Sequence, residues 1–145
     1  MEVLVRTMTI ADYDNVYSLW KSTPGVGMRS LDDSREGIGR FLDRNPKTCF
    51  VAEAGDKIIG AILCGHDGRR GYIYHATVFP DYRKRGIGRR LVENVLTALR
   101  LEGINKAALV VFNTNAEGNA FWQAVGFETR GDLIYRNISL NEENI

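Results

Sequence analysis

The stretch that most constrains the fold of this chain runs from residue 78 to residue 88 and reads VFPDYRKRGIG. Residues 72–78 are rich in β-branched and aromatic side chains, as strands are, and Pro80 ends the strand because proline cannot donate to a ladder. Gly86 and Gly88 follow, and an amphipathic helix begins beside them. The stretch therefore predicts a strand, a tight loop and the first turn of a helix.

A loop of this kind suits a phosphate. The first N–H groups of a helix lack intrahelical partners and carry the positive end of the helix dipole, and glycine lets the backbone approach a ligand closely. The alternative is a plain strand–turn–helix connection with a solvated basic turn. Cationic side chains around the loop favour the phosphate: Arg83, Lys84, Arg85, Arg89 and Arg90.

Two widespread phosphate loops do not fit. A Walker loop ends in Gly-Lys-Ser/Thr, whereas two arginines follow Gly88, and a dinucleotide-binding fingerprint needs a third glycine where this chain has Leu91. The pattern that fits is Arg-x-x-Gly-x-Gly at Arg83, Gly86 and Gly88, directly after a strand that ends Val-x-Pro. This pattern resembles the coenzyme A loop of the GCN5-related N-acetyltransferase (GNAT) family, in which backbone N–H groups hold the pyrophosphate of acetyl-CoA.

Hydrophobic periodicity and turn residues predict the element order β-α-α-β-β-β-α-β-α-β. We expect a capping box at Thr9 and Asp12, a second helix capped by Asp32 or Asp33, and a parallel pairing of the strands at 72–78 and 106–112. The nearly continuous apolar run at 106–112 predicts a central strand that is buried on both faces. The strands are expected at residues 3–6, 48–54, 57–64, 72–78, 106–112 and 133–139, and the helices at 10–20, after 33, 87–102 and 116–125.

This order is that of the GNAT family, and the resemblance covers essentially the whole chain, weakly before residue 48 and well after it. Val-Ala-Glu at 51–53 with Ile-Gly-Ala at 59–61 is similar to a family hairpin, and Asn-(x)6-Trp-x-x-x-Gly-Phe at 115–127 resembles the family's Asn-(x)6-Tyr-x-x-x-Gly-Phe. The chain is similar to the small stand-alone bacterial members of the YpeA type. The implied fold is α/β, with a central mixed sheet flanked by helices in one domain at 1–140 and a loose tail at 141–145.

Composition narrows the class of protein. The chain has 145 residues and a net charge of +1, which gives no general field for a polyanion. The longest apolar run is too short to cross a bilayer, and no signal peptide opens the chain. We therefore expect a cytoplasmic protein without nucleic-acid or membrane partners and without a metal, and the sequence leaves a homodimer open. Cys49 and Cys64 are expected to be buried, reduced thiols.

The resemblance implies transfer of an acetyl group from acetyl-CoA to an amine. It places the thioester where the strands that end at Val78 and Phe112 splay apart, with the Val78 N–H as donor to the oxyanion. Asn115 is expected to bond the pantetheine arm, although its position also allows it to cap the following helix. The implied cofactor-binding residues are Val78, Phe79, Arg83, Lys84, Arg85, Gly86, Ile87, Gly88, Asn115 and Trp122.

The chain departs from the family pattern at two positions. Trp122 stands where many members have a Tyr that protonates the thiolate, and an indole N–H is no usable acid at neutral pH. Tyr74 stands where many members have a Glu base. Strand alternation puts Tyr74 on the cleft face and His75 on the opposite face, so His75 is interpreted as structural. With Tyr135, a candidate for the acceptor pocket, the catalytic candidates are Val78, Tyr74, Trp122 and Tyr135.

Three functions compete. The leading hypothesis is an acetyl-CoA-dependent N-acetyltransferase. The second is a coenzyme A sensor without turnover, which stays open because the family's Glu and Tyr are missing. The third is a nucleic-acid binder that uses Arg83–Arg90, but these charges gather on one loop instead of forming a stripe.

Overall fold

The protein is described here by a computed structural model that covers residues 2–145. A five-stranded sheet has the order β1-β2-β3-β4-β5, in which the first four strands are antiparallel neighbours and β5 runs parallel to β4. This mixed sheet confirms the predicted fold class. The strands are β1 (Val3–Thr7), β2 (Phe50–Ala54), β3 (Lys57–His66), β4 (Gly71–Val78) and β5 (Ala107–Leu109).

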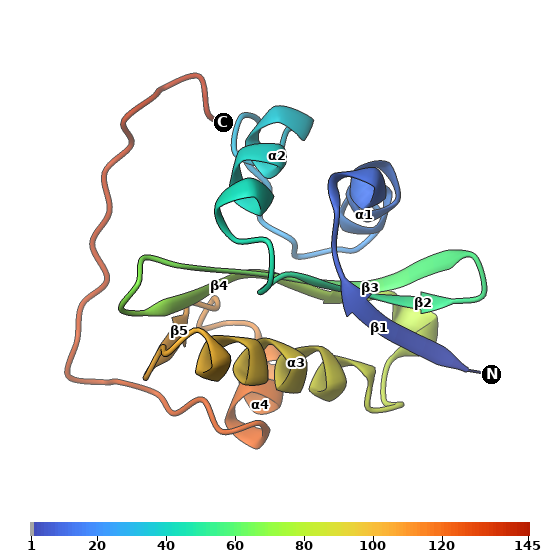
Figure 1. Ribbon diagram of the computed structural model, residues 1–145. Helices are drawn as coiled ribbons and strands as arrows, with labels where there is room; N and C mark the ends of the chain where they lie inside the picture. Colours follow the sequence, from blue (N-terminus) through green and yellow to red (C-terminus); the bar gives the residue numbers. More distant parts are fainter. Residues whose placement is uncertain (1) are drawn as a thin grey trace.

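Helices cover both faces of the sheet (Figure 1). The helices α1 (Tyr13–Lys21) and α2 (Arg35–Arg44) lie on one face, and α3 (Ile87–Leu101) and α4 (Ala116–Ala124) lie on the other. Single 3-10 turns precede α1 at Ile10–Asp12 (η1) and follow β4 at Pro80–Tyr82 (η2).

Each face has its own apolar core. On the α3 face, Leu91, Val95 and Leu99 recur at helical spacing and pack against Ile59 and Ile73 of the sheet. On the other face, the core is built from Val16, Trp20, Ile38, Leu42, Val51 and Leu63. Burying one such side chain stabilises the fold by about 1.5–3 kcal/mol, so the two layers hold the sheet between them.

The start of α1 is tied to the sheet edge. The backbone N–H of Thr9 donates to the Asp12 carboxylate at 2.9 Å, as the predicted capping box requires. The same carboxylate accepts two hydrogen bonds from Arg6, at 2.7 and 2.9 Å, and Arg6 also pairs with Glu53 of β2. The hydrogen bond from Arg6, opposed by burial, lowers the pKa of Asp12 below its usual value.

The cap of α2 differs from the prediction. Ser34, and neither Asp32 nor Asp33, is the N-cap, and its hydroxyl accepts the Gly37 N–H at 3.0 Å. Ser and Asp both favour this position, so composition alone could not choose between neighbours. Asp33 bonds elsewhere, as described below.

The last strands also differ from the prediction. β5 has three residues and lies at the sheet edge, and Val110 and Phe112 beyond it are 56% and 72% exposed. Residues 133–139 form no strand, and the chain from 128 onward runs extended outside the sheet (Figure 1). An apolar run forms a strand only where a neighbouring strand pairs with it, and β5 has one neighbour within residues 2–145.

The final residues are not loose, contrary to the expectation. Asn144 accepts the N–H groups of Leu31 and Asp32, each at 3.0 Å, and donates to the Asp32 carboxylate at 2.9 Å. The hydroxyl of Ser30 donates to the Glu143 carbonyl at 2.9 Å. The end of the chain is therefore bonded to the connection between α1 and α2.

Candidate active site

β4 separates from β5 half-way along its length. The pairing between the two strands ends at Ile73 opposite Leu109, so residues 74–78 have no strand on that side within the described chain. The Phe79 N–H donates to Ile59 of β3 at 2.8 Å, and successive N–H groups of a strand point to opposite sides. The Val78 N–H therefore points to the unpaired edge, and the predicted splay of the two strands is present.

The loop after β4 presents a row of free backbone donors. From Lys84 to Arg89, no N–H group has a protein acceptor within residues 2–145, and the first helical bond runs from Arg90 to Gly86 at 3.1 Å. Lys84 and Gly86 have positive φ angles, 62° and 78°, which turn consecutive N–H groups toward one side. Such a nest at a helix N-terminus is an anion-binding concavity. We call residues 83–89 the cradle.

Arg83 joins the cradle to the strand before it. Its Nε donates to the Val78 carbonyl at 3.0 Å. Since the C=O and N–H of one strand residue point the same way, this bond lies at the unpaired edge of β4. The cradle and the splayed edge are therefore parts of one site.

The two cradle glycines have different roles. A Cβ at Gly86 would meet open space, so its positive φ is what demands glycine there. A Cβ at Gly88 would lie 3.1 Å from the ring of Phe121, so glycine there makes room for α4 against α3. The ring of Trp122 follows, half-buried between Phe121 and Phe127 with ring centroids 5.0 and 5.2 Å away. Aromatic packing accounts for the position of Trp122.

Asn115 caps α4. Its side-chain oxygen accepts the Gly118 N–H at 2.9 Å, which is the alternative that the sequence left open. This bond uses the carbonyl oxygen of the amide and leaves the NH2 group without a recorded protein acceptor in the described chain. The expected bond between Asn115 and the pantetheine arm could therefore come only from that NH2 group.

Aromatic side chains line the strand where it separates from β5. The rings of Tyr72 and Tyr74 lie 4.8 Å apart, and Phe41 of α2 meets Tyr74 edge-on at 5.5 Å. Burial raises the pKa of both tyrosines, and the nearby hydroxyl of Tyr135 raises each further. The structure thus brings Tyr135 near Tyr74, and the raised pKa keeps the phenols of Tyr72 and Tyr74 protonated, so neither of these two is a base at neutral pH.

A β-bulge changes the face on which His75 lies. Ile62 of β3 stands opposite Ala76 and Cys64 stands opposite Ile73, so Leu63 alone faces both Tyr74 and His75. The bulge puts both side chains on the α1–α2 face: Tyr74 touches Phe41, and His75 meets Trp20 of α1 at 4.9 Å. The prediction that His75 faces away from Tyr74 was wrong, because alternation holds only where residues pair one to one.

His75 is also bonded on that face. Its Nε2 lies 2.8 Å from Oδ1 of Asp33, and the two side chains are 13% and 7% exposed. Nothing in the residue pattern indicated this pair, because the two residues are far apart in the chain and belong to a loop and a bulge.

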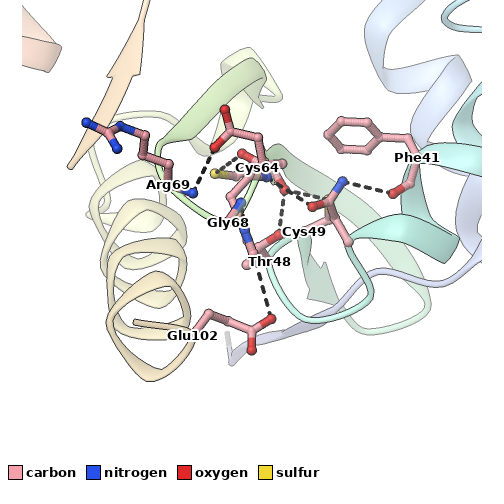
Figure 2. Close-up of polar contacts among 11 residues, drawn as sticks. Phe41, Thr48, Cys49, Cys64, Gly68, Arg69 and Glu102 are labelled. Carbon is pink, nitrogen blue, oxygen red and sulfur yellow. Dashed lines mark hydrogen bonds and ion pairs between the residues drawn. The ribbon is translucent and has the colours of Figure 1, made fainter. Parts of the chain in front are cut away.

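The two cysteines are buried, free thiols, as predicted. Burial raises the pKa of Cys49 to about 12 and that of Cys64 to about 11, so neither is a nucleophile at neutral pH. The carbonyl of Cys64 accepts bonds from the Thr48 hydroxyl at 2.6 Å and from the Cys49 thiol at 3.4 Å (Figure 2). Among residues 2–145 no three His, Cys, Asp or Glu side chains gather in a way that could hold a metal ion.

A groove of about 590 Å³ opens on the α1–α2 face and includes no cradle residue. Asp33 lines it together with Tyr13, Tyr17 and the terminal Ile145. Asp33, the hydrogen-bond partner of His75, therefore borders a groove on the face of the sheet opposite α3. None of the helices described here is long and apolar enough to cross a membrane.

The model of the acetyltransferase (GNAT) family matches residues 13–127. The chain belongs to the GNAT family. The matched residues include β4, the cradle and α4. The family resemblance and the fold expected from the sequence are confirmed.

Curated relatives of this GNAT chain are named acetyltransferases. Acetyltransferase SG1711 of Sodalis glossinidius is 29% identical over 139 residues, covering 96% of both chains. Acetyltransferase ECA0875 of Pectobacterium atrosepticum is 30% identical over 125 residues, covering 86% of this chain and 87% of the relative. These names support an acyltransferase.

Solved structures share the fold. The PaiA N-acetyltransferase of Thermoplasma acidophilum, in complex with coenzyme A, has a TM-score of 0.76 at 22% identity and covers 90% of this chain and 94% of its own. Ard1 of Thermoplasma volcanium also has a TM-score of 0.76, at 18% identity, covering 87% of this chain and 82% of its own. At these identities the likeness concerns the fold.

Proposed function

We propose that the protein is an acetyl-CoA-dependent N-acetyltransferase that moves the acetyl group directly to a primary amine in a ternary complex. The observation that carries the proposal is the cradle, where successive N–H groups from Lys84 to Arg89 have no protein acceptor in the described chain. A pyrophosphate accepts several such bonds at once, and the basic side chains of the loop add charge attraction. The coenzyme A complex of a protein with this fold supports the choice of ligand.

The splayed edge supplies the second part of the reaction. A thioester that extends from the cradle along residues 74–78 would bring its carbonyl oxygen to the Val78 N–H, which points to the unpaired side. One preorganised donor of this kind contributes about 10²–10³ in rate. Phe79, Ile87, Asn115 and Trp122 would complete the cofactor site, and Tyr74 and Tyr135 would border the acceptor.

The leaving group needs no strong acid. A coenzyme A thiol resembles a Cys side chain, with a pKa of about 8.5, so its thiolate departs readily near neutral pH. A non-catalytic coenzyme A sensor is the other candidate function, and the curated relatives, named acetyltransferases, do not favour it. Consumption of acetyl-CoA with a panel of amines separates the two.

The two ends of α3 offer a matched pair of glycines for the binding test. Gly86 and Gly103 flank α3, have φ angles of 78° and 79°, and would each place a Cβ in open space. Valine at either position costs similar backbone strain, about 1–3 kcal/mol, but only Gly86 lies in the cradle. We expect Gly86→Val to abolish coenzyme A binding in calorimetry and Gly103→Val to leave it intact at a similar melting temperature. Equal affinities would refute the cradle assignment.

A further inference from the structure

The imidazole of His75 is held like the base of a proton-transfer site. Its Nε2 meets Oδ1 of Asp33 at 2.8 Å, which places the ring proton on Nε2 and leaves the lone pair on Nδ1. Asp33 is itself fixed, because its Oδ2 accepts the Arg29 N–H at 2.7 Å and its backbone carbonyl accepts the Tyr13 hydroxyl at 2.6 Å. Among residues 2–145, Nδ1 of His75 has no hydrogen-bond partner.

The position of His75 along β4 suits a role in proton transfer. His75 lies in the bulge, just beyond the point where β4 separates from β5, and three residues before Val78. Three strand residues span roughly 10 Å, so a proton released at the splayed edge would reach the ring through water. Asp33, which bonds the ring, also lines the groove of the α1–α2 face.

Two buried polar atoms of residues near His75 lack partners in the described chain. They are Nε1 of Trp20, whose ring contacts the imidazole, and Oγ1 of Thr77, two residues along the strand. Leaving a buried polar group unbonded costs about 1–3 kcal/mol, so each suits a bond to water or to a polar substrate atom. Both residues belong to the α1–α2 side of the sheet, on which His75 also lies, because Trp20 is in that core and Thr77 stands opposite Ala61 of the same core.

We propose that His75, oriented by Asp33, is the general base of the acetyl transfer and receives the proton of the acceptor amine through water held by Thr77 and Trp20. The inference rests on the proposed function. The acceptor arrives as an ammonium ion, and its proton passes through that water to Nδ1 of His75, which frees the lone pair on nitrogen. The neutral nitrogen then forms a bond to the thioester carbon while the C=O electron pair moves to oxygen. Collapse re-forms the C=O and breaks the C–S bond, the thiolate leaves with the electron pair, the nitrogen gives its second proton to the thiolate or to solvent, and His75 releases its own proton to solvent.

The first test compares His75→Gln, Asp33→Asn and Thr77→Val with the wild type in steady-state transfer to a basic alkylamine. A general base contributes about 10²–10⁴-fold, so we expect a loss of kcat in that range for His75→Gln, with coenzyme A affinity unchanged. Asp33→Asn keeps the shape of the side chain but removes the charge that orients the imidazole, so we expect it to lower kcat by a smaller factor than His75→Gln does. Thr77→Val should lower kcat several-fold without changing the KM for acetyl-CoA. Variants within threefold of the wild type would overturn the proposal.

The second test separates catalysis from structural support. A weakly basic amine, such as an aromatic amine, is already neutral at the assay pH, so the penalty of each variant should shrink with it, and added imidazole should partly restore His75→Gln. An equal loss with both amines and no rescue would assign the pair a purely structural role. Should His75→Gln fail to fold, the amine comparison is decided by Asp33→Asn and Thr77→Val. A wild type that binds coenzyme A but acetylates no amine would instead refute the proposed function, and with it this role.

Discussion

At the scale of single residues, Trp122 has two possible roles, aromatic packing and proton donation to the leaving thiolate. The structure surrounds the indole with Phe121 and Phe127, and this contact explains a large aromatic side chain without any proton transfer. We therefore expect Trp122→Phe to keep kcat within a few-fold of the wild type, because the ring still fills its place and no acid is lost. A general acid would contribute about 10²–10⁴-fold, so steady-state transfer between pH 6 and 9 distinguishes the cases. Trp122→Ala is the matched variant for packing and should lower the melting temperature. A hundredfold loss in Trp122→Phe with unchanged coenzyme A affinity would show that the indole N–H takes part in the reaction.

At the scale of elements, the sequence predicted what local pattern determines and missed what depends on neighbours. The helix expected at 87–102 is found at Ile87–Leu101, because its apolar spacing and Gly103 define it locally. The strand at 106–112 shortened to Ala107–Leu109, because pairing with another strand decides where a strand ends. The face of His75 was mistaken for the same reason, since one unpaired residue in a bulge reverses alternation and leaves no mark on the residue pattern. The cradle was predictable because loop and helix start are contiguous in sequence, whereas the His75–Asp33 pair joins two distant segments.

The bonds of Asp12 connect β1, η1 and β2 and predict how stability depends on pH. Asp12 accepts bonds from Arg6 and from the Thr9 N–H, and the Arg6 bond lowers the pKa of Asp12 below 3.8. A carboxyl whose folded pKa is lowered stabilises the fold above its unfolded pKa and loses that contribution as pH falls through the folded value. Asp12→Asn should therefore cost about 1–3 kcal/mol of unfolding free energy at pH 7, and the gap to the wild type should narrow below pH 3.8. Urea unfolding at several pH values measures this. Asp14→Asn is the control, because Asp14 is 89% exposed and 3.9 Å from Arg35, and it should change little. A gap that stays constant down to pH 2 would contradict the linkage.

At the scale of the whole molecule, the end of the chain joins the two faces of the sheet. The segment from residue 128 leaves the α3–α4 face, passes outside the sheet edge and is bonded to the α1–α2 connection (Figure 1). Asn144 makes three of those bonds, to Leu31 and Asp32, and holds the segment so that Tyr135 stays near Tyr72. Asn144→Ala should leave the global melting temperature almost unchanged, since exposed hydrogen bonds contribute about 0.5–1.5 kcal/mol each at most, but it should speed trypsin cleavage at Arg130 and Arg136 several-fold. Asn141→Ala is the control, because among residues 2–145 the Asn141 side chain bonds only the Glu143 N–H, which lies in the same segment. Equal cleavage rates in the wild type and Asn144→Ala would mean that the bonds to Leu31 and Asp32 do not hold the segment in solution. The acceptor border at Tyr135 would then have to form by contact with substrate.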